Sequence, residues 1–200
     1  MNQPLPFEND SFDAIVCQEG IEHLENVPSF LAECRRILKN GGRLFITTPN
    51  YLDLSSRLSF FLTGLKGFRS HYPNEESSIW GIAAGRVYHG HAFTLPFFQI
   101  RYLLRINQFD SIQLNGVKRS TTSSVLYWVM RPIIPVLSAL LTRRRIRRDR
   151  KDGCPTVSQP LQQELHGFAT SKDLLMSKTI LVESRLSEGS FQPSARFAFD

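Results

Sequence analysis

The sequence is poor in cysteine, and the spacing of its cysteines does not suggest a structural role. Only three occur in 200 residues, Cys17, Cys34 and Cys154, which is too few and too scattered for a disulfide framework or a zinc ribbon. This usage favours a reducing compartment. The opening residues M-N-Q-P-L-P contain neither the basic nor the apolar segment of a signal peptide. We therefore expect a cytoplasmic chain that is not secreted by that route.

A long uninterrupted apolar run is also absent. One strongly apolar stretch, residues 125–141, would be about 26 Å long as a helix, but Arg131, Pro132 and Pro135 interrupt it. A single membrane-spanning helix is therefore not expected. Seven basic residues and one acid follow within residues 143–151. Two interpretations stay open for residues 125–151: an in-plane anchor on an anionic membrane surface, or an insertion packed on the domain with a solvated basic turn.

Outside that basic run, positive and negative charges are balanced. The formal net charge is +6, but the 17 basic residues that lie outside the run equal the 17 acidic ones. The high isoelectric point therefore reflects one segment rather than a basic domain. Because no aromatic residues are interleaved with the arginines and no nucleic-acid motif is present, we expect no specific nucleic-acid partner.

The first fifty residues contain the pattern of a strand, a helix and a second strand. Residues 13–17 form a short apolar run between polar turns, which is typical of a buried strand. A helix is predicted over residues 27–40, with Asn26 as its cap and Gly41 and Gly42 as its stop. Residues 43–47 form the second strand. Two parallel strands joined by a helix predict an α/β sheet, whose ligands lie beyond the carboxyl ends of the strands.

The rest of the chain offers weaker signals for secondary structure. Helices are predicted over residues 51–63 and 94–107, and strands over residues 111–114 and 179–183. Residues 149–160 read as a flexible loop. We divide the chain into a partial core (1–118), an apolar helical insertion with the basic run and loop (119–170), a final core strand (171–186) and a tail (187–200).

Several motifs resemble the C-terminal half of a class I S-adenosylmethionine-dependent methyltransferase. They are C-Q-E-G-I-E-H-L at residues 17–24, G-G-R-L-F-I-T-T-P-N at residues 41–50, H-A-F-T at residues 91–94 and the strand near residues 174–182. The resemblance covers roughly residues 5–185 and implies a Rossmann-like fold. It implies S-adenosylmethionine as the cofactor.

This sequence has no counterpart of the first half of the family's fold. A glycine-rich loop after the first strand, and the acidic residue that holds the ribose, have no counterpart here. The resemblance therefore implies an N-terminally truncated fold with about four strands in the family order 4-5-7-6, the last strand of the chain being antiparallel. The strand at residues 13–17 would then be an open edge that is able to pair with a partner.

The resemblance also implies where the site lies. Cofactor contacts would come from Cys17, Gln18, Glu19 and Gly20. In the same loop, Glu22 and His23 are the candidate catalytic residues, with His23 as general base. The candidate substrate pocket is formed by Thr48, Pro49, Asn50 and His91. A simple strand-end turn at residues 17–20 and a proline-directed turn at residues 48–50 remain the alternatives.

A divalent metal is a further option for this loop. Glu19, Glu22 and His23 form E-x-x-E-H, and this pattern resembles two metal-using branches of the family, ubiquinone-biosynthesis O-methyltransferases and small-RNA 2′-O-methyltransferases. His91 is the candidate fourth ligand for Mg²⁺ or Mn²⁺. Such a metal would lower the pKa of a substrate hydroxyl. The alternative is that Glu22 and His23 cap the following helix and line the pocket without metal.

The expected activity is methyl transfer from S-adenosylmethionine to an oxygen of a small-molecule, sugar or lipid-linked acceptor. We expect this chain alone to bind the donor poorly, because the glycine-rich loop is lacking. A non-catalytic half-domain that pairs through its open sheet edge, or that lies on a membrane, is the alternative from a different class. A misassigned start of the coding sequence is a third interpretation.

Overall fold

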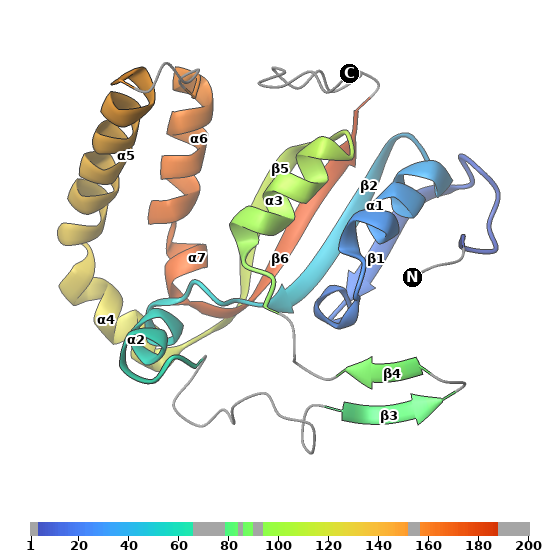
Figure 1. The fold of residues 1–200 in the computed structure, drawn as a ribbon, viewed down its shortest axis with the longest axis horizontal. Coiled ribbons are helices and arrows are strands. Elements are labelled where there is room, and N and C mark those ends of the chain that lie inside the picture. Colours follow the sequence, from blue (N-terminus) through green and yellow to red (C-terminus); the bar gives the residue numbers. More distant parts are fainter. Residues whose placement is uncertain (1–3, 66–78, 84–85, 90–93, 152–156, 188–200) are drawn as a thin grey trace.

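The protein is built around one mixed α/β sheet. The computed structural model describes residues 4–65, 79–83, 86–89, 94–151 and 157–187 (Figure 1). The sheet has four strands in the order β1-β2-β6-β5. Strand β1 (Phe12–Gln18) is parallel to β2 (Leu38–Pro49), and β6 (Ser177–Leu186) is antiparallel to both β2 and β5 (Phe109–Arg119).

The α/β class, the four strands and the parallel first pair are confirmed. The four predicted strand segments all lie in this sheet, and the last strand of the chain is antiparallel to its neighbours, as expected. The details differ, because every strand is longer than predicted. A separate two-stranded antiparallel ribbon, β3 (Ile79–Ala83) and β4 (Arg86–His89), was not predicted.

Helix α1 (Val27–Ile37) begins as predicted but ends early. The Asn26 side chain accepts a hydrogen bond from the Ser29 amide at 3.0 Å, which confirms the cap. The predicted stop at Gly41 and Gly42 is wrong, since Leu38 already has an extended backbone and is fully buried. The two glycines instead lie within β2. Gly41 has a φ of +74°, and a Cβ on Gly42 would approach the Lys39 carbonyl oxygen to 2.8 Å.

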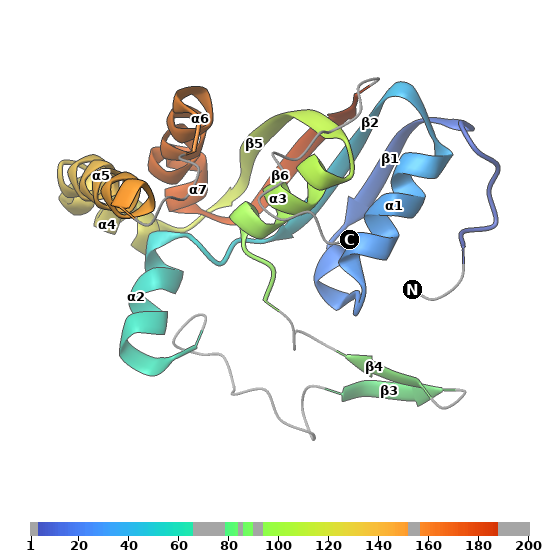
Figure 2. The same ribbon diagram turned by 45° about the horizontal axis from the view of Figure 1, so that its top comes forward.

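Helices α1 and α3 (Phe97–Ile106) lie side by side on one face of the sheet in both views (Figures 1 and 2). Helix α3 begins later than predicted because Pro96, rather than Thr94, occupies the cap position. The core between helices and sheet is apolar. Its fully buried members include Leu31, Cys34, Leu44, Ile46, Ile100, Leu104 and Val182.

A second group of helices lies beyond β5. It comprises α4 (Thr121–Met130), α5 (Ile133–Lys151), α6 (Gln159–Thr170) and α7 (Lys172–Met176), and α2 (Leu54–Thr63) packs against α4. The predicted loop at 149–160 is wrong at both ends, since α5 continues to Lys151 and α6 starts at Gln159; residues 152–156 lie outside the described residues. Helix α2 starts three residues later than predicted, after Asp53.

No single helix in the described ranges is long and apolar enough to cross a membrane. Helices α4 and α5 pass that test only together, as a pair bent by 69°. The bend falls at Arg131 and Pro132, between the two helices, where the sequence predicts an interruption.

Polar contacts tie the helical group to the core. Arg101 of α3 donates two hydrogen bonds to Glu164 of α6, at 3.1 and 2.7 Å. Partial burial alone would raise the pKa of Glu164, but the hydrogen bonds and charges of Arg101 and Arg105 outweigh it and lower the pKa. Asp53 accepts a hydrogen bond from the Ser123 hydroxyl at 2.6 Å, which links α2 to α4.

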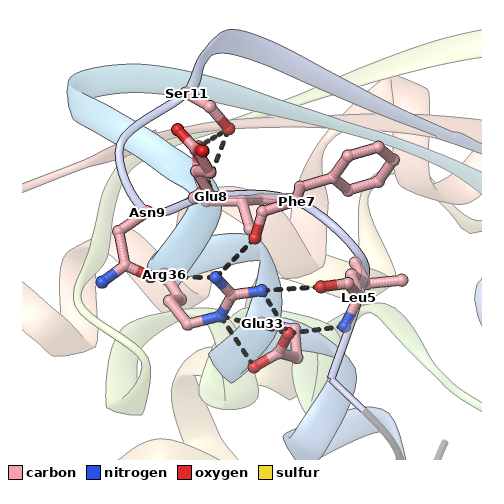
Figure 3. A network of polar contacts seen from close by, with 8 residues as sticks. Leu5, Phe7, Glu8, Asn9, Ser11, Glu33 and Arg36 are labelled. Atoms are coloured by element: carbon pink, nitrogen blue, oxygen red, sulfur yellow. Dashed lines mark hydrogen bonds and ion pairs between the residues drawn. The ribbon is translucent and has the colours of Figure 1, made fainter.

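Arg36 of α1 binds the N-terminal segment through several hydrogen bonds (Figure 3). Its guanidinium donates to the carbonyl oxygens of Leu5 and Phe7, at 3.0 and 2.8 Å, and to the Asn9 side chain at 2.9 Å. It also pairs with Glu33 at 2.8 Å, and Glu33 accepts a bond from the Leu5 amide. The hydrogen bonds from Arg36 and the Leu5 amide lower the pKa of Glu33 below its ordinary value.

This network predicts a pH-dependent stability difference. A carboxyl group with a lowered pKa in the folded state stabilises the fold above its unfolded pKa, and this contribution is lost as the pH falls through the folded value. The urea midpoint of Arg36→Leu should lie below that of the parent protein. This difference should become smaller, but not vanish, as the pH is lowered from about 7 to about 3. It should not vanish because the bonds to Leu5 and Phe7 do not titrate. Arg35→Leu, an exposed neighbour on the same helix, is the control; a difference independent of pH would contradict the assignment.

The close packing at Gly116 makes a second stability prediction. A Cβ at Gly116 would lie 2.1 Å from the Ser177 hydroxyl and 2.9 Å from Asp173 Oδ1. Gly116→Ala should therefore lower the free energy of unfolding by about 1–3 kcal/mol, as overpacked substitutions do. Gly167→Ala is the matched control, since a Cβ there meets nothing within 4 Å, and it should be neutral or stabilising in α6. Urea unfolding measures both, and equal stability of the two variants would exclude the clash.

Candidate functional site

The ends of β1 and β2 meet at one edge of the sheet. Gln18 pairs with Thr47 at the last step of the parallel register. Just beyond it, the Glu19 amide donates to the Thr47 carbonyl oxygen at 3.0 Å and lies 3.1 Å from its hydroxyl oxygen. The predicted cofactor loop and the predicted substrate turn are therefore neighbours.

The loop after β1 turns sharply and sends its two carboxylates in different directions. Glu19 has a φ of +44°, a left-handed conformation that is unusual for this residue type. A short 3-10 helix, η1 (Ile21–His23), follows. Glu19 is exposed, whereas the Glu22 side chain is buried.

Glu22 is a buried carboxylate at this edge with only part of its hydrogen-bonding capacity used. One oxygen accepts a hydrogen bond from the Thr48 hydroxyl at 3.2 Å. The other, Oε1, is buried and has no hydrogen-bond partner among the described residues. A buried polar atom without a partner is costly, so its retention indicates a further contact that the described residues do not supply.

The charge of Glu22 acts on two neighbouring groups. Burial, with a smaller contribution from the Glu22 charge, raises the pKa of the Cys17 thiol and of the Tyr51 hydroxyl. Burial also raises the pKa of Cys34, which lies in the core near Cys17, to about 12. Both described thiols therefore remain protonated at neutral pH and are poor nucleophiles.

The predicted pocket residues at the end of β2 have structural roles. Thr48 is fully buried and points at Glu22. Asn50 is also buried; its amide nitrogen donates to the carbonyl oxygens of Leu174 and Ser177, at 2.6 and 2.7 Å. Its side-chain oxygen accepts from the Leu52 amide. With both amide hydrogens used, Asn50 tethers the turn after β2 to α7 and β6.

The predicted metal set does not assemble within the described ranges. No group of three His, Cys, Asp or Glu side chains there is placed to hold a metal ion. The physical reason is the left-handed turn at Glu19, which leaves that side chain exposed while Glu22 turns inward. His91 lies outside the described residues, so its place in the pocket stays a prediction. The described residues alone therefore do not form the predicted metal site, and a site completed by His91 stays a prediction.

His23 and Tyr51 also lie at this edge of the sheet. His23 ends η1, is half-buried and interacts with other groups. Tyr51 was not predicted as a site residue, although it directly follows the T-P-N turn and is buried beside Glu22. Its position immediately after a strand end is the signal that the sequence offered.

A separate surface pocket lies away from this edge. It has a volume of about 470 Å³ and is lined by Asn9, Asp10, Arg35, Asn40 and Gln108, among others. These residues lie near the amino ends of β1, β2 and β5, opposite to the edge that carries Glu22. This pocket is therefore separate from the candidate site.

Comparison with known proteins finds similarity in the first part of the chain. The family model described as "Methyltransferase domain" matches residues 2–46. Rat ubiquinone biosynthesis O-methyltransferase (Rattus norvegicus, mitochondrial) is 48% identical over 55 residues, 28% of this chain and 16% of that protein. The uncharacterized methyltransferase YcgJ of Bacillus subtilis is 34% identical over 77 residues, 38% of this chain and 30% of that protein.

Among solved structures, a SAM-dependent methyltransferase from Thermotoga maritima aligns over 90% of this chain and 59% of its own. Its TM-score is 0.46 and its sequence identity is 11%. The chain thus covers only part of the length of the relatives it matches. The match to the family model covers residues 2–46, which include β1, the candidate loop and the first part of β2.

The electrostatic coupling between Glu22 and Cys17 can be tested by alkylation. Glu22→Gln removes one of the two causes that raise the Cys17 pKa, so Cys17 should react with iodoacetamide at lower pH than in the parent. The shift should be partial, because burial is the larger cause and remains. Peptide mass spectrometry across a pH series measures it. Glu19→Gln is the control, and an equal shift in both variants would refute the coupling.

Proposed function

We propose that this chain, whose residues 2–46 belong to the methyltransferase-domain family, takes part in S-adenosylmethionine-dependent methyl transfer to an acceptor oxygen. The acceptor is a small molecule, a sugar or a lipid-linked compound. The observation that carries the proposal is the buried Glu22 carboxylate at the carboxyl edge of the parallel strands, one oxygen of which has no hydrogen-bond partner among the described residues. In open α/β sheets this is the edge at which ligands bind.

The choice of oxygen as the acceptor atom rests on the relatives. The first matches are named as O-methyltransferases of ubiquinone biosynthesis. The chain covers only 16% and 13% of the length of these two relatives, so the acceptor class is carried over to this chain as part of the proposal.

When bound, the donor would supply a methyl group on a positively charged sulfur. The acceptor oxygen would bond to the methyl carbon in line with the carbon–sulfur bond, which would break and leave S-adenosylhomocysteine as a neutral thioether. A hydroxyl acceptor must lose its proton as the new bond to carbon forms, and a carboxylate or imidazole within hydrogen-bonding reach accepts it. Glu22 Oε1 is the buried acceptor available for that proton, with the Thr48 hydroxyl holding the other oxygen in place. His23, in the same loop, is the candidate for passing the proton on to solvent.

The described residues fit the donor only in part. Gly20, in the loop predicted to lie against the methionine end, leaves the backbone open to approach: a Cβ there would meet only the Cys17 sulfur and a carbonyl oxygen, at 3.5 and 3.6 Å. A glycine-rich loop for the other end of the donor has no counterpart in the sequence. We propose that this part is supplied by a strand that pairs with the outer edge of β1.

The open edge of β1 also supports the second candidate, a non-catalytic half-domain that pairs with a partner. In the described part of the chain β1 pairs with β2 alone, and Val16 in its middle is 69% exposed. An apolar edge strand of this kind is a site for pairing with another strand. The two candidates differ in whether the loop at residues 17–20 meets the donor.

Amide chemical shifts of the ¹⁵N-labelled chain, titrated with S-adenosylhomocysteine, separate the two candidates. Methyl transfer predicts weak binding, with a dissociation constant of about 1 mM, because only one end of the donor is held. The shifts should be confined to residues 17–23 and 47–51. Adenosine alone should leave the amides of residues 17–20 unchanged, since these are expected to meet the methionine end.

Matched variants make this titration decisive. Gly20→Leu should abolish the shifts, while Gly167→Leu on the exposed side of α6 should retain them. An absence of shifts at about 10 mM ligand would exclude the donor site and favour the half-domain. Shifts that cluster at Arg35, Asn40 and Gln108 would place binding in the opposite pocket and overturn the proposal.

A further inference from the structure

Helix α5 turns its apolar side outward. The exposed apolar residues fall at i, i+3, i+4, i+7 and i+8, which is one face of a helix: Ile133, Val136, Leu137, Leu140 and Leu141. Each is about half exposed or more. In both views α6 lies between α5 and the sheet, so this face points away from the protein core (Figures 1 and 2).

The inner side of α5 is mixed, since Ile134 packs against an apolar cluster while Ser138 and Thr142 are also half-buried. The hydroxyl of Ser138 lies 2.9 Å from His166 Nδ1 of α6, and Thr142 donates to the Ser138 carbonyl oxygen at 2.9 Å. A helix that packs on a core in water normally has the reverse arrangement, with its apolar face inside. Most of the large apolar side chains of α5 therefore lie on its outer face, which is not expected of a helix whose outer face meets only water.

Helix α4 carries a second exposed apolar strip. Val125, Trp128 and Val129 follow the same i, i+3, i+4 spacing, and each is 64% or 65% exposed. The Arg131 guanidinium lies 5.6 Å from the centre of the Trp128 ring. A tryptophan beside an arginine is typical of the boundary between an apolar phase and water.

The outer face of α5 changes from apolar to basic along the helix. Continuing the same spacing beyond Leu141, the face reaches Arg144, Arg147 and Arg148, which are all exposed. Arg143 and Arg145 beside them are exposed as well. A surface that offers apolar side chains and then a cluster of arginines complements a bilayer with anionic headgroups.

We propose that the outer faces of α4 and α5, here called the α4–α5 face, bind an anionic phospholipid surface, with the helices lying in the plane of the interface. An in-plane position is favoured over a spanning one because the pair is bent by 69° and Arg131 lies at the bend. A nucleic acid would match the arginines but leave the apolar strip uncovered. This inference goes beyond the proposed methyl transfer and does not depend on it.

Co-sedimentation of the whole chain with vesicles tests the proposal. The chain should bind vesicles of phosphatidylcholine with phosphatidylglycerol more than about tenfold more tightly than vesicles of phosphatidylcholine alone. Replacing Arg144, Arg147 and Arg148 by Gln should remove this preference. Replacing Val136 and Leu140 by Gln should weaken binding to both kinds of vesicle, because it removes apolar area from the outer face.

Matched controls change the same residue types elsewhere on the surface. Arg35, Lys118 and Arg119 to Gln removes three exposed charges, and Ile106 and Val117 to Gln removes two exposed apolar side chains. Both control variants should bind vesicles like the parent. Circular dichroism and thermal unfolding confirm that every variant is folded, which is expected because all the replaced side chains are exposed.

Three outcomes would overturn the proposal. The first is an absence of binding to anionic vesicles by the folded parent chain. The second is an equal loss of binding in the control variants, which would show that the effect is not specific to the α4–α5 face. The third is self-association without vesicles that is abolished by Gln at Val136 and Leu140, since this would identify the face as a contact between two copies. None of these outcomes alters the result of the donor titration.

Discussion

The parallel pairing of β1 with β2 decides where every polar group of the candidate site lies. Because the two strands end together, the Glu19 amide reaches the Thr47 carbonyl oxygen, and Glu22 can turn inward onto the Thr48 hydroxyl. The antiparallel strand β6 then fixes the turn after β2 through Asn50. The Glu22 carboxylate is therefore oriented by the Thr48 hydroxyl at the end of β2, and β6 holds the turn that follows. The proposed proton transfer would need a carboxylate that is positioned in this way.

The sequence predicted the sheet well and the helical group poorly, for physical reasons. Short apolar runs between polar turns and the Asn26 cap are local signals, so the strand–helix–strand unit could be recognised. The end of α1 was missed because burial of Leu38 depends on the assembled core. Helix α6 was missed because its anchor is the ion pair of Glu164 with Arg101, residues 63 positions apart in the chain.

In the candidate site, too, the sequence predicted the local arrangement but not the features that depend on the folded structure. The sequence brought Glu19, Glu22 and His23 together in one loop, and the structure keeps them there. It could not show that the left-handed backbone at Glu19 would separate the two carboxylates, because such a conformation is unfavourable for a glutamate and depends on the surrounding bonds. The sequence also could not show that the Asn50 side chain donates its hydrogen bonds to carbonyl oxygens of α7 and β6.

Helix α4 starts at the same edge of the sheet as the Glu22 loop. Strand β5 runs parallel to β2, since both are antiparallel to β6, and the ends of both strands lie opposite the start of β6. A chain resting on a bilayer through α4 and α5 would hold this edge next to the headgroups. It would then meet a lipid-embedded compound by lateral diffusion, so that turnover would depend on the density of that compound per unit area of bilayer instead of its concentration in the aqueous volume.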